Sequence, residues 1–529
     1  MPFSGITYFP AIPPVVKPVL VMRQAPASIG GALPITLNGL LEVERSFSLT
    51  GPGTKTIRDG ITGSGTLTIE AGSGAVILNG PAPILGGSDL RIVTDDYFYI
   101  PNGLTIPADS TVSLIGFPGS VFTGKGTNSF TVNGTIDMGT VNIDNPAGAV
   151  TINGVFKTAH AGGLEGGCIT AASVVNVNGN STIEYNSTGN QAITSSTVLE
   201  GPGTYYNLTF SGGGVKTLAG TANVSNHLRI GGVAVVDALL YNIGSASAAF
   251  TMTGGRLQLG TGGVQPQMAG VYTISAGVVQ FARNSGPQLI RSGAGYVYHD
   301  IEVAGNQTQI NGGADVYLNA GGIFYIKSTG TLNSGNQAIQ GPTGVQAFVM
   351  ETGGTLFCTN EAGFSGPLSG INSPAVRSNV ENISLAPGST IHYSRSGAQT
   401  ITNDVAYQHL VLTGSGNRTA PAGTLAVAGN FTKSGTSVFA HNNGKVTFTG
   451  TAGQTFSNVS GFPIELYDLT NSSSNTGLTV NSDSLAIANE LVLSPGSKLN
   501  LAGGNIILRS TMNGTASLAT VPNESNIIN

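Results

Sequence analysis

The chain has 529 residues, of which 78 are glycine and only 9% are charged, and its formal net charge is −5. Hydrophobic residues make up 40% of it, which excludes a disordered tract, because disorder needs low hydrophobicity and high net charge. The sequence shows no basic stripe, which argues against nucleic acid as a partner, since phosphate binding needs clustered Lys and Arg.

Residues 1–40 differ from the rest of the chain. Prolines recur there and make the segment extended and unable to form a helix; they are Pro10, Pro13, Pro14, Pro18 and Pro26. We expect an anchor or cap that lies along the body of the protein, covers its end, or docks on an assembly partner. The apolar run 15–21 is broken by Lys17 and Pro18, so it fits neither a signal peptide nor a membrane span. We therefore expect no membrane insertion and, if Met1 is the true start, no ordinary secretion.

From about Leu41 onward the pattern predicts short strands and no helix. Thr alternates with Val, Ile or Leu at period two, and Gly, Asn, Pro or Ser bounds each run. The clearest predicted strands are 66–69, 75–78, 104–106, 111–115, 130–132, 136–138, 141–143 and 150–152.

An internal sequence repeat with four copies organises the second part of the chain. Each copy has a strand that ends in an aromatic residue, then a glutamine beside an apolar pair, then a second strand that runs into a Gly/Ser turn. The glutamines are Gln191, Gln288, Gln399 and Gln454. Repetition of short strands predicts stacked coils, that is, an all-β, elongated, parallel β-helix-like solenoid. We divide it into residues 41–175 and the repeat-containing residues 176–529. A row of separate β-sandwiches is the alternative, because it also gives short strands at this spacing.

The repeats resemble Gly/Thr-rich β-repeat surface proteins of Bacteroidetes, which are adhesin-like and exported by the type IX system. The resemblance rests on six stretches, namely 206–218, 223–230, 48–57, 412–419, 427–432 and 507–517. It implies a non-enzymatic structural or adhesive protein on an exterior surface, with glycan or protein as receptor. The family carries an export signal before the repeats and a sorting domain after them, and this sequence shows neither pattern. We therefore also expect a phage or injection-particle fibre, for which a trimer is a candidate, or a fragment of a larger adhesin.

The best candidate contact group is Asp95, Asp96, Tyr97 and Tyr99, which could bind glycan. Adjacent residues on a strand point to opposite faces, so the two carboxylates share one site only at a bend. A glycan-cleaving β-helix enzyme, with carboxylates as acid and base, is the rival interpretation. Other acidic residues are scattered, namely Asp137, Asp144, Glu165, Asp300 and Glu302.

Other motifs favour structural roles. We expect no cofactor and no metal site, because His and Cys lack ligand spacing, and the segment 119–125 resembles a phosphate-binding loop without its Ser or Thr. We expect Cys168 and Cys358 to be free and buried. Repeated aromatics could form a glycan-stacking strip, but a ladder in the core is the favoured interpretation; they are Tyr185, Tyr206, Phe281, Tyr298, Tyr393, Tyr407, Phe448 and Tyr467.

Overall fold

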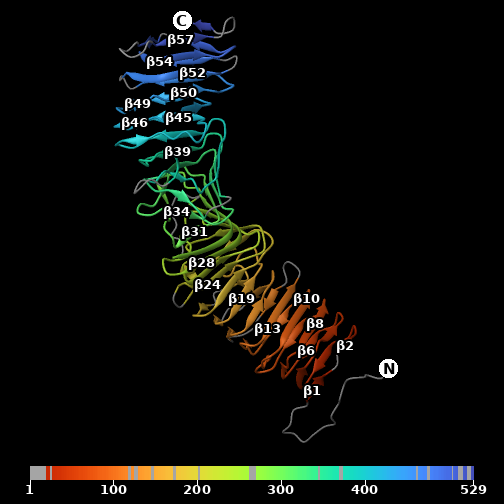
Figure 1. Ribbon diagram of the computed structural model, residues 1–529. Coiled ribbons are helices and arrows are strands. Elements are labelled where there is room, and N and C mark those ends of the chain that lie inside the picture. Colours follow the sequence, from red (N-terminus) through yellow and green to blue (C-terminus); the bar gives the residue numbers. More distant parts are fainter. Residues whose placement is uncertain are drawn as a thin grey trace. The chain divides into compact units, whose positions relative to one another are not determined.

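The fold is described here from a computed structural model of the chain (Figure 1). It describes residues 19–528 except 24–26, 117–120, 124–128, 145–147, 171–173, 201–202, 261–269, 343–345, 368–372, 460–462, 474–476, 503, 510–515 and 521–525. Two compact units divide the chain. Unit 1 comprises Met1–Leu257 and Pro266–Val271, and unit 2 comprises Gln258–Gln265 and Tyr272–Asn529.

The protein is an all-β solenoid, as the repeats predict. Strands make up 51% and helix 1% of it, and parallel coils stack into about 20 turns. Among the described residues the only helix is one 3₁₀ turn, η1 (Ser196–Val198). Successive coils lie side by side in Figure 1, each strand paired in parallel with the strand one coil further along.

Unit 1 contains one long parallel ladder and several shorter ones. In pairing order the long ladder is β2 (Ala27–Gly30), β5 (Phe47–Thr50), β8 (Thr66–Gly72), β10 (Asp89–Thr94), β13 (Thr111–Gly116), β16 (Thr135–Asp137), β19 (Val155–Thr158), β22 (Thr182–Tyr185), β24 (Tyr205–Phe210), β26 (Val224–Ile230) and β28 (Ala249–Leu259). The others are β1 (Val19–Met22), β4 (Leu40–Val43) and β7 (Gly60–Thr62); β3 (Ile35–Leu37), β6 (Lys55–Ile57), β9 (Val76–Leu78) and β11 (Phe98–Tyr99); β12 (Leu104–Ile106), β15 (Phe130–Val132), β18 (Val150–Ile152) and β21 (Val175–Val177); β14 (Val121–Thr123), β17 (Asn142–Asp144) and β20 (Ile169–Thr170); and β23 (Gln191–Ile193), β25 (Val215–Leu218) and β27 (Val235–Asp237).

Unit 2 repeats this arrangement. Its longest ladder is β30 (Gln288–Ile290), β33 (Thr308–Ile310), β36 (Thr331–Asn333), β39 (Thr355–Cys358), β43 (Thr390–Tyr393), β45 (His409–Leu412), β48 (Phe431–Lys433), β51 (Gln454–Asn458), β53 (Leu478–Asn481), β55 (Lys498–Asn500) and β58 (Asn526–Ile528). The others are β29 (Val271–Phe281), β32 (Asp300–Val303), β35 (Ile323–Ile326), β38 (Ala347–Met350) and β42 (Asn382–Leu385); β31 (Tyr296–Tyr298), β34 (Val316–Leu318), β37 (Ile339–Gln340), β41 (Val376–Arg377) and β40 (Ser365–Gly366); β44 (Gln399–Thr400), β46 (Asn417–Thr419) and β49 (Val438–Ala440); and β47 (Thr424–Val427), β50 (Lys445–Phe448), β52 (Ile464–Asn471), β54 (Leu485–Leu493) and β56 (Ile506–Leu508), with β57 (Ser517–Thr520) also on β54.

Period-two alternation places one apolar stack inside each unit. On β22 the burial alternates, with Ile183 and Tyr185 buried and Thr182 and Glu184 partly exposed. Ile183 pairs with Leu208 of the next coil, and Leu208 pairs with Leu228, so like side chains stack in register. Each such side chain contributes about 1.5–3 kcal/mol when it is fully buried. The core therefore grows coil by coil along the chain.

The glutamines of the four repeats connect each coil to the preceding one by hydrogen bonds at a corner. All four are buried, and each side-chain amide donates to the carbonyl of the last residue of a strand in the preceding coil. The acceptors are Thr158 (2.8 Å), Leu259 (3.0 Å), Cys358 (2.9 Å) and Val427 (2.9 Å), for Gln191, Gln288, Gln399 and Gln454 respectively. Each glutamine oxygen accepts a backbone N–H four or five residues earlier, from Ser187, Arg283, Arg395 or Gly450. The repeated glutamine is thus a structural bracket.

A tyrosine pair accompanies the glutamine in two copies. The Tyr185 and Tyr205 hydroxyls lie 2.9 Å apart, and Tyr205 donates to the Thr194 carbonyl at 2.6 Å. In the third copy Tyr393 and Tyr407 lie 2.6 Å apart, and Tyr407 donates to the carbonyl of Thr402 at 2.8 Å. The core interpretation of the aromatics is confirmed for Tyr185, Phe281, Tyr298, Tyr393, Tyr407 and Phe448, which are all buried, whereas Tyr206 and Tyr467 are partly exposed.

The solenoid begins earlier than predicted. β1, β2 and β3 lie within the segment assigned to the N-terminal arm, and β1 pairs in parallel with β4. The prediction that strands start near Leu41 was wrong, because proline bounds short strands without excluding them, and the apolar run of β1 suits a strand. Residues 1–18 lie outside the described part, and the boundary near residue 175 stays a prediction.

Predicted strands agree closely elsewhere. The predictions 104–106, 130–132 and 150–152 coincide with β12, β15 and β18, and the remaining ones overlap a strand.

Turns after the strands need glycine. At Gly212, φ is 73° and an added Cβ would lie 2.4 Å from the Ser187 carbonyl oxygen of the preceding coil. A side chain there would force the coils apart.

Candidate functional site

The two predicted carboxylates lie at a corner. Asp95 and Asp96 form an exposed bend between Thr94, the last residue of β10, and β11. The Asp95 N–H donates to the Gly72 carbonyl at 2.8 Å, and the Asp96 N–H donates to the Thr94 hydroxyl at 3.1 Å. That hydroxyl donates to the Gly74 carbonyl at 2.9 Å, which ties the bend to the preceding coil. Because Asp95 and Asp96 lie at a bend and not within a strand, both carboxylates can face the same surface.

The two predicted tyrosines lie beside this bend. Phe98 is 3% exposed and anchors β11 in the core, while Tyr97 on one side of it is 38% exposed and Tyr99 is partly exposed. The rings of Tyr97 and Tyr99 contact edge to face, with centroids 6.4 Å apart and an interplanar angle of 80°. The structure therefore brings the predicted group together as one exposed corner with aromatic and carboxylate character.

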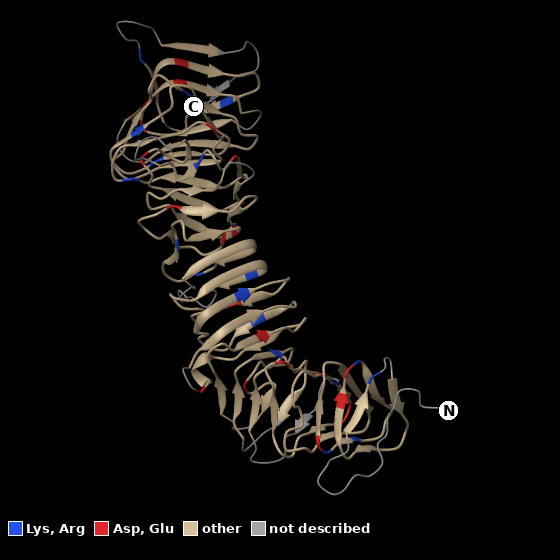
Figure 2. Ribbon diagram, turned by 60° about the horizontal axis from the view of Figure 1, so that its bottom comes forward, with Lys and Arg blue, Asp and Glu red and all other residues tan. Residues whose placement is uncertain are grey.

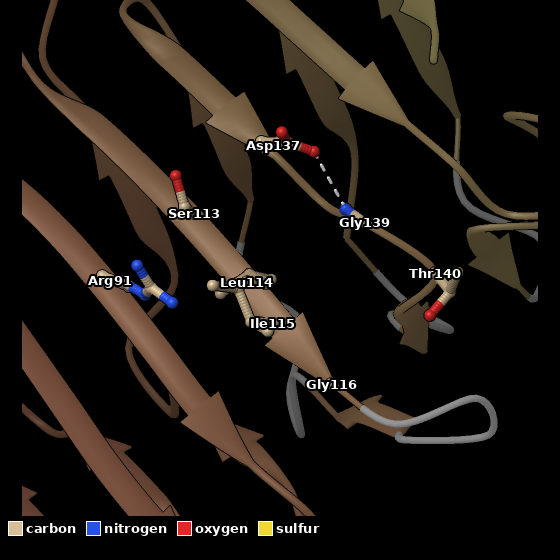
Figure 3. Close-up of a pocket in the computed structure, with 8 residues that line it drawn as sticks. All are labelled: Arg91, Ser113, Leu114, Ile115, Gly116, Asp137, Gly139 and Thr140. Carbon is tan, nitrogen blue, oxygen red and sulfur yellow. Dashed lines mark hydrogen bonds between the residues drawn. The ribbon is translucent and has the colours of Figure 1, made fainter. Parts of the chain in front are cut away.

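A hollow of about 410 Å³ lies on the outward face of the same coils (Figure 3). Arg91 on β10, Ser113 on β13 and Asp137 on β16 line it, together with residues 114–116, Gly139 and Thr140. Arg91 pairs in register with Ser113, and Ser113 pairs with Asp137. Parallel register thus assembles a guanidinium, a hydroxyl and a carboxylate from segments more than 20 residues apart.

Arg91 and Asp137 stand on opposite sides of Ser113. Two strand spacings separate them, about 9.6 Å at the backbone, because neighbouring strands lie about 4.8 Å apart. One oxygen of Asp137 accepts the Gly139 N–H at 3.0 Å, drawn dashed in Figure 3. Among the described residues Arg91 has no hydrogen-bond or ion-pair partner. The hollow therefore offers an unpaired cation and a fixed carboxylate.

The hollow and the predicted corner adjoin. Arg91 is on β10, and the bend at Asp95 follows Thr94, which pairs in register with Gly116 of the hollow's lining. Sequence reasoning found the corner and noted Asp137 only as a scattered acid. It missed Arg91 and Ser113, since pairing across coils of unequal length gives no signal in a single sequence.

On ten coils of unit 1, a polar residue occupies the strand position that Arg91, Ser113 and Asp137 hold at the hollow. We call this row of residues the polar ladder. It consists of Ser28, Ser48, Thr68, Arg91, Ser113, Asp137, Lys157, Glu184, Thr209 and Arg229. Beyond the hollow, Lys157 and Glu184 of the ladder form an ion pair. Lys157 lies 3.3 Å from Glu184, and Glu184 also accepts the Ser211 hydroxyl at 2.6 Å. Charged side chains are otherwise sparse along both units (Figure 2).

The remaining predicted acids do not converge on either feature. Asp300 binds His299 at 3.0 Å and accepts the Ile323 N–H at 2.9 Å, which is a local structural role. Glu302 is buried and accepts the Gln280 amide at 2.9 Å. Burial and the nearby Glu200 raise the pKa of Glu165. The side chain of Asp144 and most of segment 119–125 lie outside the described residues.

Both cysteines are free and buried, as predicted. Burial raises the pKa of each thiol to about 12. In the part of the chain that the structure describes, no group of three His, Cys, Asp or Glu side chains could hold a metal ion. Within the same residues, no helix has the length and apolar character needed to cross a membrane.

Comparison with known proteins leaves the family open. No protein-family model, no curated protein and no solved structure matches the chain. The resemblance to Bacteroidetes surface repeats therefore stays a prediction.

Proposed function

We propose that this chain is a non-enzymatic structural and adhesive protein, a fibre or rod displayed on the outside of a virion, an injection particle or a cell. It contacts surface glycan or protein through the outward face of its coils. The observation that carries the proposal is the polar ladder of unit 1, which repeats short polar and charged side chains in register on ten consecutive coils.

The repetition supports adhesion by many weak contacts. Each rung offers only a hydroxyl or a charge, but rungs about 4.8 Å apart present them to one extended ligand at high effective concentration. The exposed corner of Asp95, Asp96, Tyr97 and Tyr99 adds an aromatic edge beside the ladder. Exposed aromatic rings and carboxylates together suit a sugar, which has apolar ring faces and many hydroxyl groups.

The rival function is cleavage of a polysaccharide. Such a site needs an acid and a second carboxylate on either side of the scissile bond, roughly 5–9.5 Å apart. Asp137 is the only carboxylate among the described residues that line the hollow. This favours binding over cleavage, although the bend of Asp95 and Asp96 directly follows β10.

Three measurements test the proposal. The full-length protein is applied to immobilised surface glycans and surface proteins, and the same glycans are incubated with it and sized by chromatography. We expect retention on a ligand with unchanged chain length. Shortened polysaccharide would establish the enzymatic rival instead. Electron microscopy of the source material, with antibody labelling, should show the chain on a particle or cell exterior, and an interior location would refute display.

A further inference from the structure

We infer that the hollow over β10, β13 and β16 binds an acidic sugar residue of a polysaccharide, with its carboxylate on Arg91 and its hydroxyl groups on Asp137 and Ser113. This inference rests on the proposed adhesive function and adds the ligand class and the residues that select it.

Arg91 is available to an anion. Its neighbours in register are Thr68 and Ser113, which carry no charge. Asp89 on its own strand and Glu70 on β8 are the nearest outward acids by register, and neither forms an ion pair with it. A guanidinium presents two parallel N–H groups that match a carboxylate, and such charge-assisted pairs are stronger than neutral hydrogen bonds.

The opposite side of the hollow suits hydroxyl groups. One oxygen of Asp137 is held by the Gly139 N–H, and no described residue donates to the other oxygen. A carboxylate accepts hydroxyl donors but repels a second anion. The lining carries one positive and one negative charge. This balance favours a ligand with a single negative charge over a phosphorylated or multiply sulfated one.

The floor of the hollow has a mixed character that a sugar ring matches. The Ile115 side chain is 42% exposed, and Gly116 and Gly139 add no side chain at the rim. The hydroxyl groups of Ser113 and Thr140 line the same space (Figure 3). A volume of about 410 Å³ is at the lower end of the range for small-ligand sites. It is large enough for one or two sugar residues of a longer chain.

Paired acidic and neutral ligands test the inference. The probes are oligosaccharides that contain glucuronate or galacturonate, each compared with its carboxyl-reduced form, and affinity is measured by calorimetry on the full-length protein. We expect Arg91→Gln to weaken binding of the acidic forms about tenfold, which corresponds to about 1.4 kcal/mol, since the variant loses a charge-assisted bidentate pair. Arg91→Lys should bind the acidic forms more tightly than Arg91→Gln and less tightly than the wild type. Lysine keeps the positive charge but lacks the two parallel N–H groups of the guanidinium.

Arg58→Gln is the matched control. Arg58 is exposed in unit 1, lies outside the polar ladder, and does not line the hollow. It should leave the affinity unchanged. Asp137→Asn should weaken binding of the carboxyl-reduced forms, because its one oxygen accepts the Gly139 N–H and its NH2 group cannot accept a hydrogen bond from a sugar hydroxyl.

The outcomes separate the inference from the proposed function. Equal affinity for acidic and carboxyl-reduced forms, or equal losses in Arg91→Gln and Arg58→Gln, would overturn the acidic-sugar inference and leave adhesion standing. No binding to these probes, with binding to neutral glycans or proteins on the wider panel, would also overturn it alone. No binding to any glycan or protein would remove the proposed function as well.

Discussion

Replacing Gln454 should destabilise one corner of unit 2 by a predictable amount. Its amide donates to the carbonyls of Val427 at 2.9 Å and Gly429 at 2.7 Å, and its oxygen accepts the Gly450 N–H at 2.8 Å. The side chain is 2% exposed. Gln454→Ala removes all three hydrogen bonds and opens a gap between two coils.

The expected loss follows from the groups left without partners. The Val427 carbonyl keeps the Thr449 N–H, at 2.9 Å. The buried Gly450 N–H and the partly buried Gly429 carbonyl lose their hydrogen bonds to the glutamine. A buried polar group left without a partner costs about 1–3 kcal/mol, and a partly buried one costs less. We therefore expect Gln454→Ala to lower the free energy of local unfolding by about 3 kcal/mol. Gln454→Met, which fills the gap but cannot bond, should cost about 2 kcal/mol.

Hydrogen exchange measured by mass spectrometry is the suitable assay. A solenoid unfolds through neighbouring coils, so a global transition need not be two-state, and exchange of peptides from residues 424–458 reports the local opening directly. Gln307→Ala is the control, because Gln307 is exposed in the same unit. A loss below about 1 kcal/mol for Gln454→Ala, or equal losses in the two variants, would refute the bracket role of the glutamine.

The other predictions concern buried polar groups. Tyr393→Phe removes a hydroxyl that lies 2.6 Å from the Tyr407 hydroxyl and accepts the Thr402 N–H. It should lower the free energy of local unfolding by about 1–2 kcal/mol in the same exchange assay. An effect no larger than that of Tyr467→Phe, at a partly exposed site, would contradict this prediction. Burial lowers the pKa of Lys216 to about 8, below its ordinary 10.5. The unfolded chain then holds more protons between about pH 8 and pH 10.5, so this residue makes stability rise with pH in that window. The difference in stability between wild type and Lys216→Met, followed from pH 8 to pH 10, should therefore change in favour of wild type as pH rises, and a constant difference would refute the shift. Cys168 and Cys358, with thiol pKa values of about 12, should resist a thiol-specific reagent at pH 8 until the protein is unfolded, and rapid labelling of the native protein would show that these thiols are accessible.

The sequence alone determined the fold class and much of the strand pattern. Period-two alternation of Thr with Val, Ile or Leu is local information, and so is the Gly or Asn at each turn, which is why β12, β15 and β18 were predicted to the residue. Repetition of Gln191, Gln288, Gln399 and Gln454 indicated a recurring structural need. The sequence did not show that each glutamine side chain forms a hydrogen bond to the carbonyl of the last residue of a strand in the preceding coil.

The tertiary structure decided what faces what. Arg91, Ser113 and Asp137 are ordinary polar residues in the sequence, and only the parallel register of β10, β13 and β16 places them around one hollow. That register depends on how many residues each corner consumes, and the corners differ in length from coil to coil. The bend at Asp95 and Asp96 likewise depends on hydrogen bonds to Gly72 and Gly74 of the preceding coil. Local patterns therefore determined that the chain forms coils, because alternation and turns are short-range, whereas the composition of the outward surface was decided by long-range pairing.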